Sequence, residues 1–126
     1  MVRYFILCFS FGLLVSCGYS SDKQAAEKNG PGDGITENPD YQKGLALIGK
    51  SDCLTCHKVD ERVNGPSYRE VAEKYAGETD TVLPYLAKKI INGSTGTWGS
   101  VFMTPHPSVS QEDAEAMVKY ILLLKK

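Results

Sequence analysis

The sequence predicts a small all-α domain of about four helices between Tyr41 and Lys126. Apolar residues in this part of the chain recur at helical spacing in four segments, and residues typical of helix starts or stops flank these segments. No segment alternates between apolar and polar residues over a length that would indicate a strand. The chain has 126 residues, of which 42% are hydrophobic and 23% are charged, so its composition is that of one ordinary globular domain.

The first two helices are expected at residues 41–51 and 67–76. Asp40 would cap the start of the first helix, because its carboxylate can accept hydrogen bonds from the free backbone N–H groups there. Pro66 directly precedes the second helix, and Gly77 stands where that helix would end.

The other two helices are expected at residues 81–92 and 111–125. Asp80 would cap the third helix, which carries Pro84 in its first turn, where proline is tolerated best. Ser110, with an acidic residue three positions later, would cap the fourth helix. The long segment between these two helices shows no periodicity, but it contains a tryptophan, a phenylalanine and a methionine, which argue against disorder.

The N-terminal end of the chain is predicted to be a lipoprotein signal peptide over residues 1–16. Arg3 precedes an apolar run that is too short to cross a bilayer comfortably and long enough for a secretion signal. The run ends "LLVSC", which resembles the bacterial lipobox, in which a cysteine is lipidated before the signal is cut away. That cysteine is Cys17, and its acyl chains would anchor the mature protein to a membrane. The alternatives are an ordinary secretory signal or an uncleaved anchor, with Cys17 incidental.

Residues 17–40 are expected to form the lipidated N-terminus and a flexible linker, and residues 41–126 the folded domain. The stretch from Gly18 to Asp40 is rich in glycine, serine, asparagine and acidic residues, and it has little to bury. The whole chain has a net charge of −1, so it lacks the excess positive charge that would favour binding to nucleic acid.

The stretch "SDCLTCHKVD" contains two closely spaced thiols and an imidazole, at Cys53, Cys56 and His57. A thioredoxin-like redox pair would follow a strand, and none is predicted here. A zinc ion needs four ligands, and His57 directly beside Cys56 is awkward for closing a tetrahedron with both thiols. Cys-x-x-Cys-His is the signature of covalent haem attachment, in which the thiols join the porphyrin edge and the imidazole lies under the iron. Haem is therefore the favoured interpretation, with zinc and dithiol chemistry as alternatives.

With these residues the domain resembles the small class I c-type cytochromes of bacteria, which are single-haem electron carriers. Beside "CLTCH", the stretch "NGPSYREVAEKYAG" resembles the family's Gly-Pro segment, and "NGSTGTWGSVFMTP" resembles its distal segment with the ligand methionine. The resemblance covers essentially all of residues 41–126. It implies a cytochrome c-like fold of about four helices wrapped around one covalently attached haem, with the last helix crossing the first near Gly44.

Carried onto this chain, the resemblance implies a role for individual site residues. Cys53 and Cys56 would form the thioethers to one haem c. His57 would be the proximal iron ligand, and Met103 would be the distal ligand. The carbonyl of Pro66 would accept a hydrogen bond from the ring N–H of His57.

The resemblance also implies that Trp98 lies near a haem propionate. One departure concerns the residue after Met103. The family often has proline there, whereas this chain has Thr104 and only then Pro105. His106 is the only competing strong ligand nearby, and we expect it at the surface, outside the site.

These features predict an electron carrier rather than an enzyme. It would cycle between Fe(II) and Fe(III), because two strong axial ligands leave no open position at the iron, and methionine raises the potential. We expect an exported, lipid-anchored monomer on the periplasmic or cell-surface side of a bacterial membrane, which passes electrons between respiratory partner proteins and binds no nucleic acid. The alternatives are a peroxidase-like haem enzyme and a small-gas haem sensor with a labile sixth ligand.

Overall fold

The structure is a computed structural model, which describes residues 34–77 and 79–126. The expected signal peptide at 1–16, the expected lipidation site Cys17 and most of the expected linker lie outside the described residues. Within the described part of the chain, no helix is both long enough and apolar enough to cross a membrane.

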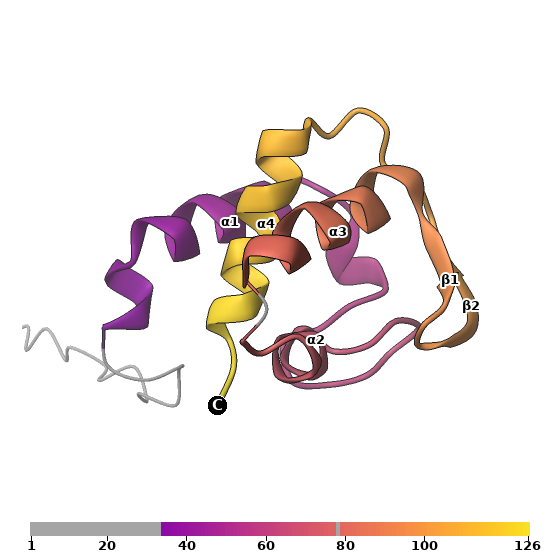
Figure 1. Ribbon diagram of the computed structural model, residues 1–126, viewed down its shortest axis with the longest axis horizontal. Coiled ribbons are helices and arrows are strands. Elements are labelled where there is room, and N and C mark those ends of the chain that lie inside the picture. Colours follow the sequence, from indigo (N-terminus) through magenta and orange to yellow (C-terminus); the bar gives the residue numbers. More distant parts are fainter. Residues whose placement is uncertain (1–33, 78) are drawn as a thin grey trace, which may run out of the picture.

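Four α-helices form the domain, and α4 packs against the other three (Figure 1). Their bounds are α1 (Pro39–Gly49), α2 (Tyr68–Lys74), α3 (Thr79–Asn92) and α4 (Gln111–Leu123). Two short 3-10 helices lie at Ile35–Glu37 (η1) and Cys53–Thr55 (η2). The predicted all-α class with four helices is therefore confirmed.

The first helix begins earlier than its sequence suggested. The Asn38 side chain accepts a hydrogen bond from the backbone N–H of Asp40 at 2.8 Å, and Pro39 occupies the first helical position. The cap is therefore Asn38, and the prediction of Asp40 as the cap is wrong. Proline is common at the first helical position, because it has no backbone N–H that needs a partner there and its fixed φ suits a helix. Part of the stretch expected to be a flexible linker is consequently ordered.

Serine residues cap α2 and α4. The Ser67 hydroxyl accepts a hydrogen bond from the Glu70 N–H, and the Glu70 carboxylate accepts one from the Ser67 N–H in return. The Ser110 hydroxyl accepts a hydrogen bond from the Asp113 N–H at 3.1 Å, which confirms the predicted cap. These bonds satisfy backbone donors that have no partner within the helix.

The third helix differs from its prediction at its start. It begins at Thr79, so Asp80 lies inside the first turn instead of capping it, and Pro84 falls in the second turn. The Asp80 carboxylate still stabilises the helix at this position, because the N-terminal end of the helix dipole is positive and attracts a negative charge. Gly93, with a φ of +73°, follows the last helical residue and ends α3, as predicted.

A short hairpin between α3 and α4 was not predicted. The strand β1 (Ser94–Gly96) pairs antiparallel with β2 (Gly99–Met103), and the register is irregular between the two paired positions of β1. Gly96 and Gly99 have φ values of +93° and +121°, so this turn needs backbone conformations that other residues rarely adopt. Four of the five residues of β2 are exposed, which explains why its sequence shows no alternation between buried and exposed positions.

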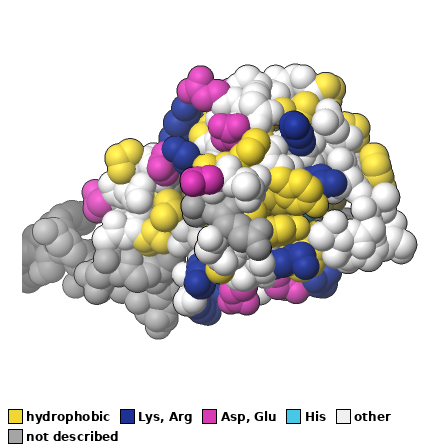
Figure 2. All heavy atoms as spheres, in the orientation of Figure 1, with side chains coloured by type: hydrophobic (Ala, Val, Ile, Leu, Met, Phe, Trp, Pro, Cys, Tyr) yellow, Lys and Arg dark blue, Asp and Glu magenta, His cyan; other side chains and the backbone are white. Residues whose placement is uncertain are grey.

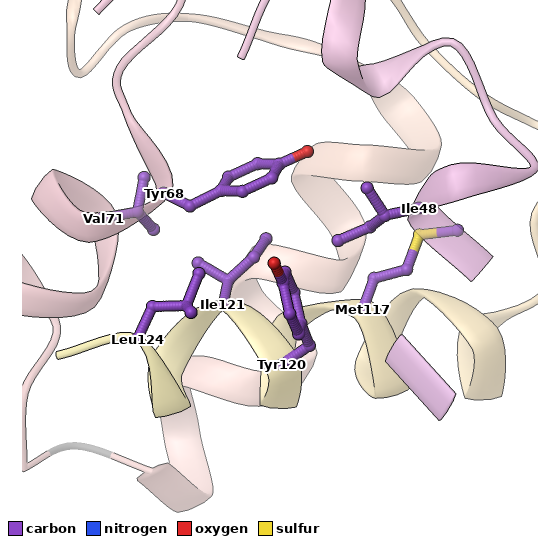
Figure 3. Close-up of a cluster of buried hydrophobic side chains, with 7 residues drawn as sticks. All are labelled: Ile48, Tyr68, Val71, Met117, Tyr120, Ile121 and Leu124. Atoms are coloured by element: carbon purple, nitrogen blue, oxygen red, sulfur yellow. The ribbon is translucent and has the colours of Figure 1, made fainter. Parts of the chain in front are cut away.

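The hydrophobic core lies where α1, α2 and α4 meet (Figure 3). Its buried side chains are Ile48, Tyr68, Val71, Met117, Tyr120, Ile121 and Leu124. A Cβ atom at Gly44 would lie 2.4 Å from both the Ala116 carbonyl oxygen and the Tyr120 Cβ, so only glycine lets α1 approach α4 this closely. The two helices therefore cross near Gly44, as expected.

Candidate functional site

A cavity of about 370 Å³ lies beside the core, with a mostly apolar lining. All six residues to which the sequence assigned a cofactor contact line it: Cys53, Cys56, His57, Pro66, Trp98 and Met103. They come from η2, from the segment before α2 and from the hairpin. Figure 2 shows apolar side chains gathered right of the centre of one face, with Lys and Arg side chains around them.

The two cysteines lie on the tight turn formed by η2. The backbone N–H groups of Cys56 and His57 both donate to the carbonyl oxygen of Cys53, at 3.2 and 3.0 Å. This turn presents both thiols and the imidazole to the same cavity. The Cys53 side chain is half-buried and the Cys56 side chain is exposed.

The imidazole of His57 is oriented by its neighbours. Its Nδ1 atom lies 2.7 Å from the carbonyl oxygen of buried Pro66, so Nδ1 carries the proton and Nε2 keeps a free lone pair. The ring stacks on Tyr68, with 5.5 Å between the ring centroids and 17° between the planes. A Cβ atom at Gly65 would lie 2.4 Å from the His57 Cε1 atom. The imidazole is thus held with Nε2 available to a metal.

Gly65 is a site residue that the sequence reasoning missed. The Gly-Pro pair was noted, but only Pro66 was given a role. The space beside the His57 ring exists only because residue 65 has no side chain. The glycine stands directly before Pro66, whose carbonyl oxygen accepts the hydrogen bond from the proximal histidine, and this position could have indicated the close approach.

Met103 is the last residue of β2 and is partly buried against the cavity. Its backbone is packed against the end of α3, because a Cβ atom at Gly93 would lie 2.5 Å from the Met103 carbonyl oxygen. Thr104 and Pro105, which follow it, are exposed. Pro105 packs at the same place, since the Cβ atom at Gly93 would lie 3.2 Å from its Cδ atom. The end of α3 thus supports the backbone of Met103 and of the residues that follow it.

His106 was expected at the surface, and this expectation is wrong. Its side chain is only 19% exposed, and it lines the same cavity. Its Nε2 atom lies 2.8 Å from the Asp52 Oδ1 atom, and its backbone N–H donates to the Ile90 carbonyl oxygen at 3.0 Å. The hydrogen bond to His106 lowers the pKa of the Asp52 carboxyl group. Local sequence patterns could not reveal this pair, because 54 residues separate its members.

Trp98 lies in the turn of the hairpin and is partly buried against the cavity. Two cationic groups lie near its ring: the Arg62 guanidinium carbon at 5.7 Å and the Lys74 Nζ atom at 5.4 Å from the ring centroid. Such cation–π contacts help to hold the Trp98 side chain in one orientation, because the face of an indole ring attracts cations. The tryptophan therefore marks a polar, positively charged edge of an otherwise apolar cavity.

These groups match the needs of a covalently bound haem. A porphyrin needs an apolar slot, two thiols at one edge and an axial imidazole with its other nitrogen fixed, and the cavity offers each of these. Zinc is not supported, since no three His, Cys, Asp or Glu side chains cluster as metal ligands within residues 34–77 and 79–126. No strand precedes Cys53 in this part of the chain, which also disfavours a thioredoxin-like pair.

Comparison with known proteins agrees with this geometry. The model of the Cytochrome c family matches residues 41–125. The chain belongs to the cytochrome c family. It is thus a small class I c-type cytochrome, with one haem c that is held covalently through Cys53 and Cys56. Proteins of this class are haem electron carriers.

Several cytochromes are similar to this cytochrome c. It is 44% identical over 84 residues to cytochrome c-552 of Nitrosomonas europaea, a match that covers 67% of this chain and 81% of that protein. It is 42% identical to cytochrome c-551 of Stutzerimonas stutzeri over 67% of this chain and 79% of that one. The crystal structure of the Nitrosomonas cytochrome c552 superimposes with a TM-score of 0.60, at 43% identity, over 64% of this chain and 99% of that one.

Proposed function

We propose that this cytochrome is an exported, lipid-anchored electron carrier whose haem iron is ligated by His57 and Met103. It would pass electrons between respiratory partner proteins. One observation carries the proposal: the thiols of Cys53 and Cys56, the His57 imidazole and the Met103 thioether all line one apolar cavity. We place the haem domain at residues 41–126, joined by residues 17–40 to the membrane.

The bound haem supplies the one-electron Fe(III)/Fe(II) couple. The protein would hold this group through the thiols of Cys53 and Cys56, the His57 imidazole and the Met103 thioether. The Pro66 carbonyl accepts the Nδ1–H of His57, which fixes the ring orientation and makes Nε2 a better donor to the metal. The thioether of Met103 is a soft ligand that favours the ferrous state and raises the potential. If both residues ligate the iron, a substrate would find no free site at the metal.

Trp98 is proposed to lie near a propionate of the haem. The support is its place in the cavity wall together with the cations beside its ring, Arg62 and Lys74. A carboxylate that is taken out of bulk water needs opposite charge or hydrogen-bond donors nearby. The indole N–H is a hydrogen-bond donor in the cavity wall, and the two cations supply positive charge beside the same ring.

The rival functions are a peroxidase-like enzyme and a gas sensor, both of which need a weak or absent sixth ligand. His106 is also a rival for the ligand position, because it lines the cavity. Its Nε2 atom is engaged by the Asp52 carboxylate, so only its Nδ1 atom could contact the haem. Met103 is the favoured ligand because it stands where the ligand methionine lies in the distal segment that this loop resembles.

Visible spectra of the purified holoprotein test the proposal. The ferric protein should show the weak red absorption band of methionine–Fe(III) coordination. The ferrous protein should not bind carbon monoxide readily, because both axial positions are filled. A ferric spectrum without the red band, together with rapid binding of carbon monoxide, would instead support the enzyme or the sensor.

Lipid anchoring at Cys17 is proposed from the sequence, since this residue lies outside the described part of the structure. Mass spectrometry of the N-terminal peptide of the native protein tests it. We expect a triacylated or diacylated cysteine at position 17 as the first residue. The variant Cys17→Ser should be released from the membrane fraction and keep its haem colour. An unmodified N-terminus at another position would exclude the anchor without affecting the assignment of the haem.

A further inference from the structure

A hydrogen bond between Asp52 and His106 joins the two parts of the chain that carry the proposed haem contacts. The Asp52 Oδ1 atom lies 2.8 Å from the His106 Nε2 atom. Asp52 directly precedes Cys53, and His106 lies three residues after Met103. The pair therefore ties the segment that attaches the haem to the segment that carries the distal methionine.

The backbone fixes His106 on its own side of this pair. Its N–H group donates to the carbonyl oxygens of Ile90 and Ile91 in the last turn of α3, at 3.0 and 3.1 Å. Its carbonyl oxygen accepts a hydrogen bond from the Val109 N–H at 3.0 Å. The imidazole thus extends from an anchored backbone toward Asp52, and the pair links α3 to the start of η2.

The other ring nitrogen of His106, Nδ1, indicates that this histidine does more than fill space. Nδ1 is buried and has no hydrogen-bond partner, whereas the other buried side-chain nitrogen and oxygen atoms in the described ranges have one. An apolar side chain would fill the same space without the cost of an unpaired nitrogen. The histidine is therefore best explained by the bond that its Nε2 atom makes with Asp52.

We propose that His106 is a positioning residue for Met103, acting through Asp52. The pair holds the exposed Thr104–Pro105 stretch against the Cys53 segment, so that the thioether of Met103 stays at the iron. This inference rests on the proposed ligation by Met103. It concerns how firmly that ligand is held, and it assigns no direct contact of His106 with the iron.

Competition with free imidazole measures how firmly the methionine is held. Ferric holoprotein is titrated with imidazole, and the loss of the red methionine band gives the concentration for half displacement. Because the Asp52 carboxylate is largely exposed to water, its bond to His106 should contribute little, and its loss should change the half-displacement concentration only a few-fold. We therefore expect Asp52→Ala and His106→Ala each to need about two- to fivefold less imidazole than the wild type.

Two further variants separate positioning from general stability. Asp52→Asn and His106→Gln each keep a polar group that can make the hydrogen bond, and they should recover much of the wild-type resistance to imidazole. Glu112→Ala removes the Lys43–Glu112 pair, which is also long-range in sequence but lies outside the cavity lining, and it should leave the imidazole titration unchanged. The double variant Asp52→Ala/His106→Ala should lose no more than either single variant, because the two changes remove one interaction.

The outcomes distinguish this inference from the proposed function. If the wild-type protein lacks the methionine band, ligation by Met103 fails. If the band is present but both alanine variants resist imidazole as well as the wild type, or their effects add fully, only the positioning role is overturned. Should one alanine variant fail to mature with haem, the other gives the same test, because each removes the bond from a different end.

Discussion

The Nδ1 atom of His57 lies 2.7 Å from the carbonyl oxygen of Pro66. This hydrogen bond sets the tautomer of the imidazole and leaves Nε2 free for the iron. Gly65 completes the arrangement, because a Cβ atom at this position would meet three atoms of the imidazole at 2.4 to 3.0 Å. The two residues of the Gly-Pro pair therefore act together on the His57 ring: Gly65 makes room for it, and Pro66 orients it.

The variant Gly65→Ala should disturb the position of the His57 ring. The added methyl group must push the ring or the backbone aside, which we expect to lower the free energy of unfolding of the holoprotein by about 1–3 kcal/mol. The reduction potential should shift as well, because the bond between Pro66 and His57 tunes the ligand. Denaturant unfolding and a redox titration measure the two effects. If neither quantity changes, the ring is not confined as the structure indicates.

The variant Gly44→Ala should weaken the fold at a different place. Its methyl group would meet the Ala116 carbonyl oxygen and the Tyr120 Cβ at 2.4 Å, so α1 and α4 must move apart. We expect a loss of about 1–3 kcal/mol in the free energy of unfolding, with little effect on the potential. Gly49→Ala on the same helix is the control, since nothing lies within 4 Å of its added Cβ. Equal stability of the two variants would contradict the close crossing.

The double variant Cys53→Ala/Cys56→Ala should fold poorly, because it cannot hold haem covalently. The cavity reaches core residues such as Ile48, Met117 and Ile121, so these side chains lose packing partners when the haem is lost. A domain of this size has little other apolar area to bury. Circular dichroism should show reduced helix content and no cooperative melting transition. A helical apoprotein with a sharp transition would show that the core is sufficient without the cofactor.

Acid should destabilise the protein through three carboxyl groups. Hydrogen bonds with His106, Arg69 and Arg62 lower the pKa values of Asp52, Asp60 and Glu70, respectively, below the ordinary values of 3.8, 3.8 and 4.5. A depressed pKa means that the contribution to stability is fully present above the ordinary value and is lost as the pH falls through the lower folded value. The denaturant midpoint should therefore be steady near neutral pH and decline as the pH drops below about 4.5.

The control for the acid experiment is Asp60→Asn, which removes one of the three groups without touching the cavity. Its midpoint should be lower at neutral pH and should depend less on acid than that of the wild type. Because Asp52 and Asp60 are largely exposed and Glu70 is partly exposed, each effect should be small. A midpoint that rises on acidification would contradict the direction of these pKa shifts.

Local signals allowed much of this domain to be predicted. The Cys-x-x-Cys-His run, the Ser110 cap and the Gly93 stop each depend on neighbours within a few residues, so their meaning can be read directly from the sequence. The first helix was misplaced for a local reason as well, because Asn38 and Pro39 form a stronger start than Asp40.

The features that escaped prediction depend on distant contacts or weak patterns. The β1–β2 hairpin has short, largely exposed strands, so burial leaves no alternating pattern in it. The bond between Asp52 and His106 joins residues that only the fold brings together, and a histidine between two prolines gave no hint of it. The close contact of Gly65 with His57 likewise depends on the turn that reverses the chain after η2.

The identity of the distal ligand is the central claim, and the ferric spectrum of Met103→Ala tests it most directly. The wild-type protein should show the weak red band of methionine–Fe(III) coordination. Met103→Ala should lose that band, have a lower potential and bind carbon monoxide in the ferrous state. His106→Ala, measured without added imidazole, should keep the band. A red band that persists in Met103→Ala, or a sixth ligand that is lost in His106→Ala but retained in Met103→Ala, would contradict the assignment.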